Sequence, residues 1–184
     1  MALPMHGEVG KETDMKDNDQ KIIDQLNDLI QLDYDAVQAY DLALQHIADA
    51  DAADDLELFK SDHERHIVEL HAVVTVLGGV PKQLGRDLKG ILIEGMTKLR
   101  SATGTTGALK AMRVNEKLTN KTYEKALQIQ MPPVAHEIVI INRDDERRHL
   151  DAIEAHIARL GDEAEVEREE ELQEDRDDVT GAHV

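Results

Sequence analysis

The chain carries six residues of metal-ligand type at spacings that suit helices. Two are single carboxylates, and four form two pairs whose members stand three positions apart. They are Asp33 and Glu116, His63 with His66, and Glu146 with His149. Residues three apart on a helix share one face, so each pair would present two ligands in the same direction. Carboxylate oxygens and imidazole nitrogens together bind divalent iron, manganese or zinc. The six residues are therefore the candidate metal ligands.

An ungapped shift of 83 positions relates the two halves of this pattern. Between residues 33 and 78, eleven of 46 positions are identical to their partners 83 positions later, against about three expected from ordinary composition. The shift brings Asp33 onto Glu116, and it brings Tyr40 onto Tyr123. Such a repeat predicts two similar helical hairpins that contribute to one shared site.

The elements that hold these residues are predicted to be helices. Helix-forming residues dominate, β-branched runs are scarce, and only four residues are aromatic, so we expect an all-α fold with an aliphatic core. Apolar residues recur at spacings of three and four within four ranges of the chain. Helix-stop signals follow the last three ranges: a Gly-Gly pair, a Pro-Pro pair and a single glycine, in that order. These ranges are residues 19–48, 56–77, 105–131 and 134–160.

The connections between the four helices predict their directions. Short links join the first helix to the second and the third to the fourth, which makes each pair an antiparallel hairpin. About 25 residues separate the second and third helices, and apolar spacing from Leu88 to Leu99 predicts a short extra helix between Gly85 and Gly104. At about 1.5 Å per helical residue, this link can cross the length of a long helix. The second and third helices can therefore run parallel.

Composition separates the ends of the chain from its middle. Residues 1–18 are polar and are expected to form a flexible lead, residues 19–161 the bundle, and residues 162–184 an acidic tail. From Gly161 onward there are eleven acidic residues and two arginines, which predicts a solvated, disordered or frayed helix end, with attraction of cations as the alternative. The net charge of −18 argues against nucleic acid as a partner.

Cysteine is absent, so any metal must be bound through oxygen and nitrogen, and disulfides and iron–sulfur clusters are excluded. No apolar run reaches the roughly 20 residues that a membrane span needs, and the first 20 residues contain no signal-peptide core. We therefore expect a protein of the cytoplasm that does not bind membranes.

The order of the candidate ligands resembles that of the ferritin-like superfamily, which includes bacterioferritins and rubrerythrins. The segments 26–30, 90–92, 115–119 and 123–127 are more specifically similar to an uncharacterised ferritin-like bacterial family labelled a domain of unknown function. The resemblance covers residues 20–161. It implies a four-helix bundle that binds two metal ions, with a carboxylate from each of two helices and a Glu-x-x-His pair from each of the others.

One position departs from that pattern, because His63 stands where the resemblance implies a bridging glutamate. Three carboxylates would then face the four positive charges of two divalent ions, an imbalance that is costly in a buried site. Asp62, one helical turn from His66, could compensate; otherwise the site could hold one ion, or zinc, or none. For His63 itself, hydrogen bonding to a carboxylate and metal ligation are both open. Tyr40 and Tyr123 could pack in the core or orient a ligand.

The resemblance and the ligand types together imply a di-iron carboxylate protein that oxidises ferrous iron or consumes oxygen or peroxide. Its cofactor would be two iron ions or one, with manganese or zinc as alternatives, and a homodimer is the expected assembly. The alternative is a non-catalytic ferritin-like bundle with a stress-related or scaffold role. No residue is singled out as catalytic apart from the candidate ligands.

Overall fold

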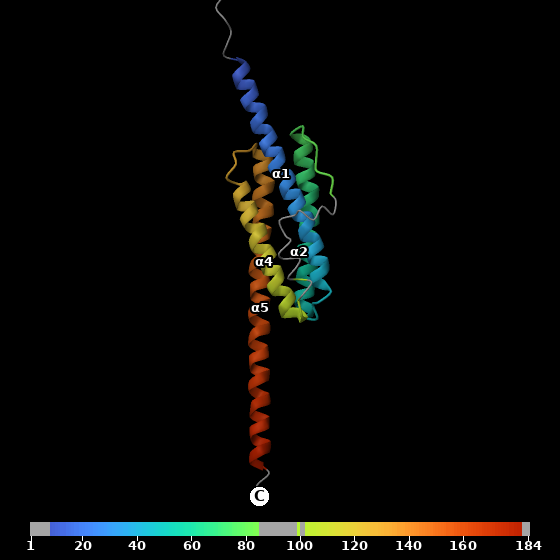
Figure 1. The fold of residues 1–184 in the computed structure, drawn as a ribbon, viewed down its shortest axis with the longest axis vertical. Helices are drawn as coiled ribbons and strands as arrows, with labels where there is room; N and C mark the ends of the chain where they lie inside the picture. The colour runs from blue at the N-terminus through green and yellow to red at the C-terminus, as the bar shows by residue number, and fades with distance from the viewer. Residues whose placement is uncertain (1–7, 85–98, 100–101, 182–184) are drawn as a thin grey trace, which may run out of the picture.

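The structure is a computed structural model that describes residues 8–84, 99 and 102–181, and these residues form four long helices (Figure 1). The helices are α1 (Glu8–Leu44), α2 (Ala50–Val76), α4 (Gly104–Ala126) and α5 (Pro133–Gly181). No strand occurs in this part of the chain, so the all-α prediction is confirmed. Within the same ranges, no helix has both the length and the apolar character needed to cross a membrane.

The four helices pack as two hairpins that close into one bundle. α1 lies along α2 and α4 lies along α5, while α1 also contacts α4 and α2 also contacts α5. Figure 1 shows α2 and α4 running in the same direction, with α1 and α5 running the opposite way. The end of α2 and the start of α4 therefore lie at opposite ends of the bundle, as the predicted crossover requires. Of the short extra helix predicted from Leu88 to Leu99, only Leu99 is described; it is helical and fully buried, and the rest of that prediction lies outside the described residues.

Local capping explains where α2 begins and ends. The carboxylate of Asp49 accepts a hydrogen bond from the backbone N–H of Ala52 at 2.9 Å, so the helix starts at Ala50 rather than at about residue 56. At the other end, Gly78 adopts a φ of 76° and the N–H of Gly79 donates to the carbonyl of Val74. This left-handed turn satisfies the last carbonyls of the helix, as the predicted glycine stop requires.

Two helices are longer than the sequence pattern predicts. α1 begins at Glu8 rather than at about residue 19, and α5 continues to Gly181 rather than ending near Leu160. In Figure 1 the two extensions project beyond the bundle at opposite ends. Periodicity marks only the part of a helix that buries a face, whereas backbone propensity lets the helix continue. A single glycine such as Gly161 costs only about 1 kcal/mol in a helix and does not stop it.

The core consists of two apolar layers with a polar layer between them. The first layer packs side chains such as Leu26, Leu29, Ile30, Leu70 and Val74. The second packs side chains such as Tyr40, Leu56, Phe59, Leu109, Met112 and Ile153. Most of these side chains are aliphatic, as expected. The polar layer thus lies between two apolar layers, and its six ligand-type side chains are fully buried.

We expect Gly78→Ala to destabilise the protein by about 1–2 kcal/mol, because an alanine in the left-handed region carries that penalty. Urea denaturation of the two proteins measures the difference. Gly161→Ala is the matched control: Gly161 lies within α5, and a Cβ added there would meet no atom within 4 Å. That variant should be no less stable than the parent, and equal losses in both variants would contradict the prediction.

Candidate metal centre

All six predicted ligand residues meet in the polar layer, and each is fully buried with 0% relative exposure. α1 and α4 each supply one carboxylate, while α2 and α5 each supply a pair three residues apart. The side chains form two overlapping groups, each able to surround one metal ion. The Asp33 group contains Asp33, His63, His66 and Glu146. The Glu116 group contains His63, Glu116, Glu146 and His149.

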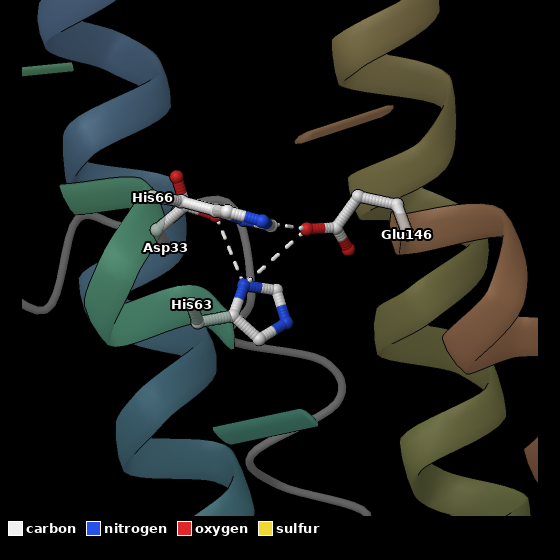
Figure 2. A group of neighbouring side chains, drawn as sticks. All are labelled: Asp33, His63, His66 and Glu146. Atoms are coloured by element: carbon white, nitrogen blue, oxygen red, sulfur yellow. Dashed lines mark hydrogen bonds and ion pairs between the residues drawn. The ribbon is translucent and has the colours of Figure 1, made fainter. Parts of the chain in front are cut away.

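The ligand atoms of the Asp33 group already lie at distances typical of atoms bound to one ion (Figure 2). His63 Nδ1 is 2.9 Å from Asp33 Oδ1 and 3.4 Å from Glu146 Oε1. His66 Nδ1 is 3.7 Å from Asp33 Oδ1 and 3.3 Å from Glu146 Oε1. Ligands about 2.1 Å from an ion stand about 3.0 Å apart in an octahedron and about 3.4 Å apart in a tetrahedron. The group therefore fits a divalent ion.

The Glu116 group is wider. His149 Nδ1 is 3.9 Å from both Glu116 Oε2 and Glu146 Oε2. His63 Nε2 is 3.8 Å from Glu116 Oε1. These atoms converge on one point from three helices, but they would have to close by about half an ångström to reach the separations of atoms coordinated to one ion. Glu146 faces both groups, with Oε1 toward the first and Oε2 toward the second.

Unsatisfied polar atoms provide the test of whether the site suits a metal. Buried nitrogens and oxygens normally have hydrogen-bond partners, since an unpaired one costs about 1–3 kcal/mol. Six ligand atoms of the two groups have none among the described residues, and every one faces the other ligands. They are His63 Nε2, His66 Nδ1, Glu116 Oε2, both oxygens of Glu146, and His149 Nδ1. A metal ion would satisfy them together, so the residues present fit it.

The far nitrogens of two histidines are held by carboxylates. His66 Nε2 lies 3.2 Å from Asp145 Oδ2 on α5, and His149 Nε2 lies 3.1 Å from Asp62 Oδ2 on α2. Histidines that bind metals commonly donate their second ring N–H to a carboxylate, which fixes the tautomer and the ring orientation. Both rings are consequently turned with Nδ1 toward the site.

Asp62 therefore lies outside both groups, although the sequence suggested it as a compensating ligand. Its carboxylate accepts hydrogen bonds from Arg65 at 3.1 Å and Arg148 at 2.7 Å in addition to its contact with His149. Asp145 has the same arginine neighbours. The two arginines bond both to their own helix and across to the facing one. The four side chains cover the histidines on the α2–α5 side.

The two buried tyrosines reach across the bundle rather than along their own helices. The Tyr40 hydroxyl donates to Glu116 Oε1 at 2.7 Å, and the Tyr123 hydroxyl donates to Asp33 Oδ2 at 2.7 Å. Each bond occupies one carboxylate oxygen and leaves the other directed at the histidines. The tyrosines thus orient candidate ligands, which was one of the two readings that the sequence left open.

Mutual compensation sets the protonation of the metal-free site. Burial alone would raise the pKa values of Asp33 and Glu116, but the neighbouring histidines outweigh burial and lower both. Burial raises the pKa of Glu146 to about 8. Burial opposes protonation of His63, yet Glu146 and Asp33 raise its pKa well above the ordinary value.

The same balance between burial and neighbouring charges sets the pKa values of the two remaining histidines. Burial opposes protonation of His66, but the nearby carboxylates of Asp33 and Glu146 raise its pKa to about 9. Burial lowers the pKa of His149 to about 4. These shifts favour ionised Asp33 and Glu116, protonated His63 and His66, and neutral Glu146 and His149 near neutral pH.

Solved structures with the same arrangement of helices are ferritin-like. One is a bacterioferritin-related protein from Bacteroides fragilis, described as a dodecameric thioferritin, with 15% identity, a TM-score of 0.67, and coverage of 80% of this chain and 90% of that chain. Another is a ferritin-like, diiron-carboxylate protein from Bacillus anthracis, with 21% identity, a TM-score of 0.59, and coverage of 76% and 97%.

A third similar structure is a two-domain protein from Anabaena variabilis with DJ-1/ThiJ/PfpI-like and ferritin-like domains. The match has 15% identity and a TM-score of 0.66, and it covers 88% of this chain but only 45% of that protein. At these identities the comparisons establish the fold. The protein is thus a ferritin-like four-helix bundle with a buried carboxylate and histidine cluster.

Residues 21–129 match the family described as a domain of unknown function, DUF2383, and the chain belongs to this family. The resemblance noted in the sequence to an uncharacterised ferritin-like family is confirmed. No curated protein matches the chain.

The metal-free protein should lose stability as the pH rises from 6.5 to 9. His66 has a folded pKa of about 9, above the ordinary 6.5, so the stability it contributes is present below pH 6.5 and lost as the pH passes 9. Glu146, with a folded pKa of about 8 against 4.5, adds to the loss because its ionisation is disfavoured by burial. At about 1.4 kcal/mol per pH unit for each titrating group, the expected fall in the free energy of unfolding is about 4–5 kcal/mol.

Urea denaturation in the presence of a chelator, at pH 6.5 and pH 9, measures this fall. His66→Asn, which removes one titrating ring, should reduce the fall by about half and leave the contribution of Glu146. An unchanged free energy of unfolding between the two pH values in the parent protein would show that the assigned protonation states are wrong.

Proposed function

We propose that the protein binds two divalent metal ions, ferrous iron in particular, and that oxygen or peroxide oxidises the bound iron. The observation that carries the proposal is the set of six buried ligand atoms that have no hydrogen-bond partner among the described residues. Hydrogen bonding within the cluster satisfies the outward atoms of the same side chains, so the unsatisfied ones are those that face the two metal positions. The similar diiron-carboxylate protein from Bacillus anthracis supports iron.

Bound iron would supply the electrons for this reaction: two ferrous ions, two protons and one hydrogen peroxide would give two ferric ions and two waters. The role of the chain is to hold and orient the ligands and to exclude other water. Asp33 and Glu116 are fixed by tyrosine hydroxyls, and His66 and His149 by carboxylates. Since the chain has no cysteine to hold an iron–sulfur electron donor, electrons come from substrate iron or from a separate protein.

Anaerobic titration with ferrous iron, followed by exposure to oxygen or peroxide, tests this function. We expect two ions per chain and a transient absorbance during oxidation. Asp33→Ala and Glu146→Ala should each reduce binding and abolish the transient, because each removes a buried ligand. Glu64→Ala and Glu137→Ala are matched controls, since both glutamates are exposed on the helices that carry the site.

Equal iron binding by Asp33→Ala, Glu146→Ala and the parent protein would place the bound iron elsewhere. The alternative of a non-catalytic bundle would then be the better description. Melting temperatures with and without iron provide a second measurement, because a ligand that binds only the folded state raises the temperature.

The carboxylates behind the histidines should contribute to metal affinity without touching the ion. Asp62→Asn and Asp145→Asn each weaken the hold on one histidine ring, and removal of such partners costs about 10–100-fold in affinity. Competition with a chromophoric chelator measures the change. Asp144→Asn, an exposed position on α5, serves as the control. Unchanged affinity in both Asp62→Asn and Asp145→Asn would contradict the orienting role.

We further propose that residues 19–161 form the metal-binding unit and that the protein acts in the cytoplasm as a homodimer. The charged surface and the absence of membrane-spanning character in the described helices support a water-exposed location. The dodecameric assembly of the related protein from Bacteroides fragilis supports association of copies of this fold.

A further inference from the structure

Of the three histidines in the two ligand groups, His63 is the one whose two ring nitrogens face different groups. Its Nδ1 lies 2.9 Å from Asp33 Oδ1 and 3.4 Å from Glu146 Oε1, within the Asp33 group. Its Nε2 lies 3.8 Å from Glu116 Oε1, within the Glu116 group, and has no hydrogen-bond partner among the described residues. Figure 2 shows Nδ1 directed at the carboxylates and Nε2 turned away from Asp33 and His66.

The other two histidines are arranged differently. In His66 and His149, Nδ1 faces the site and Nε2 contacts a carboxylate outside it. Each of these rings can therefore serve one ion only. Glu146 is the other residue that faces both groups, with one oxygen toward each. His63 and Glu146 thus occupy equivalent positions between the two metal positions.

We propose that His63 bridges the two metal ions, with Nδ1 bound to one ion and Nε2 bound to the other. The inference rests on the proposed metal binding. Bridging requires that both nitrogens are free of protons, so the protonated ring releases both of its ring protons to solvent and becomes an imidazolate with one negative charge. The imidazolate of His63 then occupies the position of the bridging glutamate and carries the same single negative charge.

Charge balance supports the bridge. Two divalent ions bring four positive charges into a buried layer, whereas Asp33, Glu116 and Glu146 bring three negative ones. An uncompensated buried charge is costly, and the imidazolate of His63 supplies the missing one. Loaded with two ions, the site then has no net charge.

Neither nearby carboxylate can supply that charge instead. Asp62 and Asp145 are the acidic side chains next to the histidines, and both point to the outer nitrogens. Each also bonds to Arg65 and Arg148, which neutralise it. The position of His63 itself is fixed by packing, because its ring lies 5.4 Å from the ring of Tyr40 and 5.3 Å from that of His149. The ring therefore stays between the two groups.

Nuclear magnetic resonance with cadmium-113 tests the bridge directly. The full chain is labelled with nitrogen-15 in histidine and loaded with two equivalents of cadmium-113, a spin-active divalent ion. We expect both ring nitrogens of His63 to show one-bond coupling to cadmium, with no attached proton, and His66 and His149 to show it at Nδ1 alone. Coupling at one nitrogen of His63, with a proton on the other, would overturn the bridge.

The same sample separates failure of this inference from failure of the proposed function. If cadmium does not bind, or if Asp33→Ala binds it equally well, the central site is not a metal site and both ideas fail. If two ions bind and His63 is coupled through one nitrogen, metal binding stands and the bridge alone is lost.

Cadmium titrations of four variants provide an independent measurement. A shared ligand affects both binding steps, so His63→Gln should weaken both by about tenfold or more. His66→Gln should weaken one step and His149→Gln the other, whereas His136→Gln, at an exposed position on α5, should weaken neither. Circular dichroism confirms that each variant is folded. Loss of a single step in folded His63→Gln would show a terminal ligand and contradict the proposal.

Discussion

Desolvation of charge in the polar layer is the constraint on which the rest of this structure depends. Six ionisable side chains are removed from water together, and a buried charge is tolerated only when it is paired. In the metal-free protein the carboxylates and histidines pair with one another, so the pKa values of Asp33 and Glu116 fall and those of His63 and His66 rise. The low polarity of the layer makes this pairing necessary. It also makes each unsatisfied ligand atom costly, and therefore a strong candidate for metal binding.

The requirement to orient these side chains links all four helices. In an antiparallel pair, residue numbers rise on one helix as they fall on the other. Tyr40 on α1 therefore lies level with Glu116 on α4, and Tyr123 on α4 lies level with Asp33 on α1. Each tyrosine can thus bond the carboxylate of the facing helix. The same register between α2 and α5 places Asp145 beside His66 and Asp62 beside His149. Helix direction thus decides which residue orients which ligand.

The ligand residues could be predicted from the sequence because residue type and spacing are local properties. Asp33 and His66 stand beside apolar positions of amphipathic helices, and the fold brings them together as expected. The role of Asp62 could not be predicted, because it depends on a register between two helices that are far apart in the sequence. The start of α1 and the end of α5 were also missed: nothing in the apolar pattern distinguishes the continuation of α5 past Gly161 from a disordered tail. The internal repeat itself stays a prediction.

The two halves of the site differ at one pair of repeat positions, where His63 aligns with Glu146 under the shift of 83 residues. This difference has a geometric consequence. Ligand atoms in the Asp33 group are 2.9–3.7 Å apart, whereas those in the Glu116 group are 3.8–3.9 Å apart. An ion in the first group would need little rearrangement and would fix one nitrogen of His63 and one oxygen of Glu146. Because an imidazole ring and a carboxylate are rigid, fixing one end also fixes the other, where the second ion would bind. If His63 bridges, occupation of the first position therefore prepares the second.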